Sequence, residues 1–183
     1  VFYSSSSEVY GEPVHLPQHE HTTPLNSKLP YAVVKNLGEA YCRSYKQEYD
    51  LDYTIFRFFN TYGRKQSSDF VVAKFMRAAL ANTDILIYGD GKQTRTFCHI
   101  RDNIDFTIKV IDSTLFVNDV VNVGSDKVIT IQEIAELIIE ITNSSSKIVY
   151  MPPLKEGDMT RRQPDITSML LTLGRPLTSL NEG

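Results

Sequence analysis

The stretch Pro30-Tyr31-Ala32-Val33-Val34-Lys35 opens a helical pattern that continues to about Tyr49, and the rest of the chain can be placed around it. Tyrosine and lysine four residues apart lie on one face of a helix, and a proline just before them is typical of a helix start. A neighbouring ammonium stabilises a charged phenol, so Tyr31 could take a proton from a substrate hydroxyl. An ordinary exposed helix can carry the same pair, so other parts of the chain must show whether Tyr31 and Lys35 are catalytic.

Four further stretches support the catalytic interpretation. They are Val1-Phe2-Tyr3-Ser4-Ser5-Ser6-Ser7-Glu8-Val9-Tyr10-Gly11, Arg57-Phe58-Phe59-Asn60-Thr61-Tyr62-Gly63, the segment 88–97 and the segment 157–165. Together with the Tyr31 stretch they follow the order of motifs in the extended short-chain dehydrogenase/reductase family. That family contains the NAD-dependent nucleotide-sugar epimerases, dehydratases and decarboxylases, and the chain resembles it over nearly its whole length.

The resemblance implies an α/β fold, made of the C-terminal part of a Rossmann-like doubly wound parallel sheet and a small α/β substrate-binding domain. Residues 1–63 would be the remaining half of the NAD-binding domain. Residues 64–183 would be mainly the substrate-binding domain, with about 97–124 returning to the Rossmann part. None of the nine glycines forms the glycine-rich turn that holds a dinucleotide. We therefore expect the glycine-rich N-terminal half to be absent, since Val1-Phe2-Tyr3 reads as the inside of a buried strand.

The family motifs assign catalytic roles to residues of this sequence by resemblance. Tyr31 would be the base, and Lys35 would hold the nicotinamide ribose. Ser6 matches the catalytic Ser/Thr, whose hydroxyl bonds the reacting sugar oxygen. Ser7 and Glu8 fall where 4,6-dehydratases have Asp-Glu and UDP-glucuronate decarboxylases have Ser-Glu. The missing aspartate counts against a dehydratase, because eliminating water requires a general acid there.

The remaining assignments concern ligands. Phe59, at a strand exit beside the nicotinamide, would contact the cofactor, which is NAD, with NADP not excluded. Ser7, Asn60, Arg95 and Arg162 would bind the substrate, Arg95 because a guanidinium grips two phosphate oxygens. Each has a structural alternative: Asn60 as a turn residue, Arg95 as a surface arginine, and Arg162 as half of a solvated charge pair.

The implied reaction is NAD-dependent modification of a nucleotide-diphosphate sugar through a transient 4-keto intermediate. The sequence favours a 4-epimerase, because no residue demonstrates a substrate carboxylate. A UDP-glucuronate decarboxylase is the alternative, and a similar segment in these enzymes brings an arginine, here Arg162, to the sugar carboxylate. An alternative of another class is a non-catalytic fragment that binds a nucleotide sugar but not NAD.

Composition narrows the possible partners and location. The chain has 183 residues and a net charge of −3, so no basic field attracts nucleic acid. No apolar run spans a membrane, and two cysteines without a spacing motif indicate a reducing compartment, the cytoplasm. His15, His19 and His21 share a polar loop over 12–29 but lack metal-ligand spacing. The resemblance implies a homodimer through the Tyr31 helix and its neighbour.

Local patterns predict further elements. Alternation and turn residues predict a hairpin of strands 85–88 and 94–100 around Gly89-Asp90-Gly91-Lys92. A strand is expected at 53–59, and helical spacing at 69–81 predicts a helix capped by Ser68 or Asp69. Asp102 should cap the helix that ends at Ser113. Short strands are expected at 120–123 and 147–150, and Thr130-Ile131-Gln132-Glu133 is a capping box before a helix to Thr142.

Overall fold

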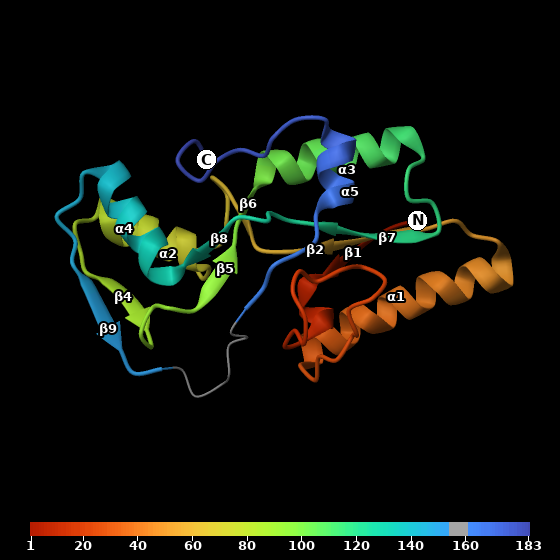
Figure 1. Cartoon of the computed structure of the whole chain (residues 1–183), viewed down its shortest axis with the longest axis horizontal. Helices are drawn as coiled ribbons and strands as arrows, with labels where there is room; N and C mark the ends of the chain where they lie inside the picture. Colours follow the sequence, from red (N-terminus) through yellow and green to blue (C-terminus); the bar gives the residue numbers. More distant parts are fainter. Residues whose placement is uncertain (154–160) are drawn as a thin grey trace.

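The computed structural model describes residues 1–153 and 161–183, and its central element is a parallel sheet. The strands lie in the order β1 (Phe2–Ser6), β2 (Thr54–Phe58) and β7 (Asp119–Val123). Helix α1 (Pro30–Tyr49) covers one face, and α3 (Ile100–Ser113) and α5 (Thr167–Leu173) cover the other (Figure 1). Parallel strands joined through helices on both faces require burial on both sides.

The residues of these elements explain the packing. Under α3 and α5 the core contains Phe56, Phe106, Val121 and Met169, all almost fully buried. On the opposite face α1 lies so close to β1 that a Cβ on Gly38 would stand 2.0 Å from the Tyr3 hydroxyl oxygen. Glycine costs helix stability, and here it permits this contact.

A second group of elements packs at the other end of the molecule (Figure 1). Its helices are α2 (Val71–Leu80) and α4 (Ile131–Thr142). Its strands are β4 (Ile85–Tyr88), β5 (Thr94–Thr96), β8 (Val128–Thr130) and β9 (Ile148–Met151). They share a core that includes Phe75, Ile87, Phe97, Ile134 and Ile138.

Two short strands join the groups. β3 (Thr61–Tyr62) pairs in parallel with β6 (Cys98–His99), directly after β2 and directly before α3. A short 3-10 helix, η1 (Ser7–Tyr10), continues β1. The expected strands at 53–59, 120–123 and 147–150 and the helices at 31–49 and to Thr142 are confirmed to within one or two residues.

The predicted hairpin is wrong. β4 pairs in parallel with β9, and β5 pairs antiparallel with β8. The loop between β4 and β5 contacts the start of α4, where Gln132 N donates to Gly91 O and Ile131 N donates to Gln93 O. The turn residues therefore shape a loop against a helix N-terminus. The opening of β1 is also not buried, because β1 is an edge strand of the three-stranded sheet and Phe2 is 52% exposed.

Helix caps give mixed outcomes. The capping box of Thr130 and Glu133 is confirmed. Asp102 does not cap α3, because His99 is the N-cap residue of that helix. The buried Asp102 carboxylate instead accepts hydrogen bonds from Arg175 Nη1 and Thr178 N. Neither Ser68 nor Asp69 caps α2, since Phe70 holds that position.

The observed architecture is α/β with parallel sheets, as expected. The division into domains at residue 63 stays a prediction. Of the two cysteines, Cys98 is buried, which raises the pKa of its thiol to about 12, and Cys42 is half-buried. In the described part of the chain no helix has the length and apolar character required to cross a membrane.

Candidate active site

A cleft of about 1240 Å³ is lined both by the carboxyl end of the β1–β2–β7 sheet and by the second group of elements. Eight of the nine predicted site residues line it: Ser6, Ser7, Glu8, Tyr31, Phe59, Asn60, Arg95 and Arg162. Ligands of open α/β folds bind at the carboxyl ends of the strands. The arrangement thus brings residues from far apart in the sequence to the place where such folds bind ligands.

The serine run passes from strand β1 into helix η1 and lines the cleft. Ser6 ends β1 and is the N-cap of η1, and its Oγ accepts a hydrogen bond of 3.2 Å from Glu8 N. Ser7 follows and is buried. An oxygen-bearing side chain is preferred at this position because it satisfies an open backbone N–H. This passage from strand to helix places three consecutive polar residues beside the cleft.

Tyr31 and Lys35 lie one turn apart at the start of α1. Pro30 opens the helix after Leu29, which has extended backbone geometry. Tyr31 is 56% exposed, and Lys35 Nζ lies 5.7 Å from the centroid of its ring. Lys35 Nζ also donates to Ser4 O at 2.7 Å. The Lys35 ammonium therefore lies between β1 and the Tyr31 ring.

Glu8 and Arg162 form an ion pair in the cleft. Arg162 Nη2 lies 2.6 Å from Glu8 Oε1, and the two side chains are 11% and 21% exposed. Arg162 is thus not part of a solvated charge pair. The motif residues Gly157, Asp158, Met159 and Thr160 lie outside the described residues.

The other residues predicted to bind cofactor or substrate lie on a strand or just after one. Phe59 is buried against Tyr10 just after β2, and Asn60 O accepts from Cys98 N. Arg95 on β5 is buried, not a surface residue, and its Nη1 donates to Thr94 O at 2.8 Å.

A buried polar row beneath the site was not predicted. Ser5, Arg57 and Asn122 occupy paired positions on β1, β2 and β7. Arg57 grips Glu39 of α1 with two hydrogen bonds, Nε to Oε1 at 2.9 Å and Nη2 to Oε2 at 2.7 Å. Burial acts to raise the pKa of Glu39, but the hydrogen bonds and charge of Arg57 outweigh it and hold that pKa below its usual range. The sequence contains one sign of this buried row, the charged residue Arg57 inside the largely apolar pattern of β2.

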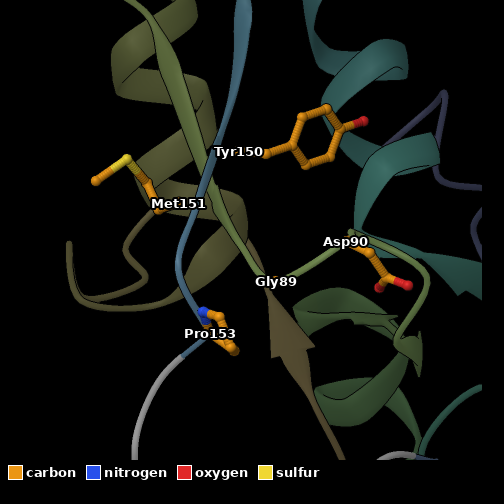
Figure 2. Close-up of a pocket in the computed structure, with 5 residues that line it drawn as sticks. All are labelled: Gly89, Asp90, Tyr150, Met151 and Pro153. Carbon is orange, nitrogen blue, oxygen red and sulfur yellow. The ribbon is translucent and has the colours of Figure 1, made fainter.

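A second, shallower hollow of about 720 Å³ lies where β4 and β9 end. It is lined by Gly89, Asp90, Tyr150, Met151 and Pro153, and the Tyr150 and Asp90 side chains extend to one side of β9 while Met151 extends to the other (Figure 2). None of the predicted site residues lines it.

Comparison with known proteins agrees with this geometry. Residues 1–124 match the model of the NAD dependent epimerase/dehydratase family. The chain belongs to this family. The family uses NAD, and its members named below act in nucleotide-sugar chemistry.

Three relatives illustrate the range of reactions. UDP-N-acetyl-alpha-D-glucosaminuronate decarboxylase from Bacillus cytotoxicus is 38% identical over 92% of this chain and 56% of its own length. UDP-glucose 4-epimerase from Thermotoga maritima, solved with UDP-glucose, superposes with a TM-score of 0.91 at 31% identity, covering 100% of this chain and 60% of that one. UDP-glucuronic acid 4-epimerase from Bacillus cereus, solved with UDP-glucuronic acid and NAD, gives 0.89 at 27% identity, covering 100% and 58%. The chain spans little more than half the length of these relatives.

Proposed function

We propose that the protein acts on a nucleotide-diphosphate sugar that carries a carboxylate, by oxidising the sugar 4-hydroxyl and then releasing carbon dioxide. The observation that carries the proposal is the Glu8–Arg162 ion pair in the cleft beside Ser6. A guanidinium with little solvent exposure offers a site for a carboxylate. The decarboxylase among the relatives supports the same substrate class.

Tyr31 is the proposed base. Its exposed ring borders the cleft, so its hydroxyl could take the proton of the sugar 4-hydroxyl while Ser6 hydrogen-bonds the same oxygen. Lys35, fixed by Ser4 O, supplies a positive charge beside the resulting phenolate. These residues would thus generate the 4-keto sugar.

The residues present fit the nicotinamide end of NAD. An ammonium has three protons, and Ser4 O accepts one from Lys35 Nζ, so others remain for the ribose. Tyr31, Lys35 and Phe59 would hold the cofactor there. When bound, NAD supplies the hydride acceptor.

Arg162 would hold the sugar carboxylate after exchange with Glu8. Oxidation at C4 makes the substrate a β-keto acid, so the bond from C5 to the carboxylate carbon can break. Carbon dioxide then leaves, the bonding electrons pass toward the ketone oxygen, and C5 takes a proton from solvent. Return of the hydride to C4, with the proton from Tyr31 to its oxygen, would then give the UDP-pentose. Arg95, Asn60 and Ser7 are the proposed ligands of the nucleotide diphosphate.

The second candidate is 4-epimerisation, which the sequence alone favoured. One observation supports it: Glu8 already neutralises Arg162, and a neutral sugar could then be accepted without disturbing the pair. We prefer decarboxylation because an arginine with so little exposure has no evident use in binding a neutral sugar.

Calorimetry on the 183-residue chain tests the substrate class. We expect UDP-glucuronate to bind about tenfold more tightly than UDP-glucose, since a charge-assisted hydrogen bond contributes roughly 1.5–3 kcal/mol. Arg162→Gln should abolish the preference. Equal binding of both sugars by the unchanged chain would favour the 4-epimerase.

Turnover tests the reaction. The chain is mixed with NAD and UDP-glucuronate, and NMR follows the appearance of a UDP-pentose, with Tyr31→Phe as the inactive control. A product epimeric at C4 would support the second candidate. Binding of the nucleotide sugar without any heat from NAD would support the non-catalytic alternative.

A further inference from the structure

We propose that Asn122 is a positioning residue: it holds the segments that carry Glu8 and Arg162, and so keeps Arg162 in the cleft where a sugar carboxylate can take the place of Glu8. Asn122 is fully buried on β7 and does not line the cleft. The inference rests on the proposed function, because it assigns the control of Arg162 to a residue outside the ligand site.

One end of the Asn122 amide holds the segment that carries Glu8. Tyr10 OH donates to Asn122 Oδ1 at 2.7 Å, and Tyr10 ends η1 two residues after Glu8. Arg57 Nη1 approaches the same hydroxyl at 3.0 Å. Burial raises the pKa of Tyr10 to about 12, so its hydroxyl remains a donor at neutral pH. The position of η1 is therefore fixed relative to β7.

The other end holds the segment that carries Arg162. Asn122 Nδ2 donates to Gln18 O at 2.9 Å and to Asp165 O at 3.3 Å. Gln18 is itself paired with that segment: Gln18 N donates to Gln163 O at 2.7 Å and Asp165 N donates to Gln18 O at 2.8 Å. The backbone on the C-terminal side of Arg162 is thus held against β7.

A single amide therefore connects both partners of the ion pair. All of its polar atoms are used, and it is inaccessible to solvent, so each bond is costly to lose. If either end is released, Arg162 should no longer be held beside Glu8 in the cleft, whereas Arg95 and Asn60, two of the proposed diphosphate ligands, lie on neither segment. The expected consequence is a loss of charge discrimination without a loss of nucleotide-sugar binding.

Two substitutions separate the ends. Asn122→Asp keeps the acceptor for Tyr10 but replaces the donors to Gln18 O and Asp165 O. Tyr10→Phe removes the hydroxyl that holds η1 and preserves the ring. For each folded variant, calorimetry gives the ratio of the Kd for UDP-glucose to the Kd for UDP-glucuronate. We expect this ratio to fall from about tenfold to below about threefold, with the UDP-glucose Kd within about twofold of the unchanged chain.

A matched control is Asp102→Asn, which weakens another buried network, that of Arg175 and Thr178. It should lower stability and leave the ratio unchanged. An unchanged ratio in Tyr10→Phe and in any folded Asn122→Asp overturns the inference, provided that Arg162→Gln lowers it. If Arg162→Gln also leaves the ratio unchanged, the proposed function itself fails. Should Asn122→Asp not fold, Tyr10→Phe alone decides.

Discussion

Removal of the Glu39 carboxylate should unfold the protein at much lower denaturant concentration. Glu39 and Arg57 are almost completely buried and share two hydrogen bonds of 2.9 and 2.7 Å. Ser5 Oγ donates to the same carboxylate at 2.6 Å. Glu39→Leu leaves the Arg57 charge buried with no carboxylate beside it, and breaking such a pair costs about 3–5 kcal/mol.

Urea unfolding followed by circular dichroism measures this loss. With a slope of about 2 kcal/mol per molar urea, the midpoint should fall by roughly 1.5–2.5 M. The double variant Glu39→Leu/Arg57→Met should recover at least half of the shift, because no charge is then left uncompensated. Lys46→Gln removes two surface ion pairs at the end of the same helix, with Asp50 and Asp52. It serves as the control and should hardly move the midpoint.

The pH dependence provides a second measurement. The folded pKa of Glu39 is held below its usual range, so the pair stabilises the fold above the unfolded carboxyl pKa of about 4.3. This contribution is lost as pH falls through the lower folded value. Glu39→Leu should therefore lose less stability on acidification than the unchanged chain. A midpoint shift below about 0.5 M, or a double variant no better than the single one, would refute the reasoning.

Three further outcomes are expected. Gly38→Ala should lower the melting temperature, with a loss of about 1–3 kcal/mol, because its Cβ would collide with the Tyr3 ring. Ile134→Ala should cost about 2–5 kcal/mol in urea unfolding, since it empties the core under α4. The apolar side chains Leu37, Tyr41 and others on α1 are exposed and would form the proposed dimer interface; Tyr41→Glu should then halve the mass measured by light scattering, and an unchanged mass would contradict it.

Sequence reasoning succeeded where a motif residue stands at the end of a strand or on the first turn of a helix. Ser6, Tyr31 and Asn60 all line the cleft, and each lies at or next to an end of β1, α1 or β2. Local sequence patterns predict where these elements begin or end, and so where these residues lie. The meeting of these three residues in one cleft was therefore predictable from the sequence.

Pairing over long sequence distances was not predictable in the same way. The turn residues after β4 indicated a local hairpin with the next strand. The strand that β4 actually pairs with, β9, lies some sixty residues later. A propensity pattern contains no information on such a partner. Asn122 was missed for a related reason, because one asparagine inside a short apolar strand differs little from scaffold until Tyr10, Gln18 and Asp165 are seen around it.

The bridge between Gln18 and the segment after Arg162 has a consequence for folding kinetics. Gln163 N and Gln18 Oε1 are 145 residues apart in the chain. Closing so long a loop carries a large entropic cost, and contacts of this kind slow folding. We expect the β1–β2–β7 sheet to form before this bridge. In a refolding experiment the circular dichroism of the backbone should return first, and selective binding of UDP-glucuronate should return in a later, slower phase.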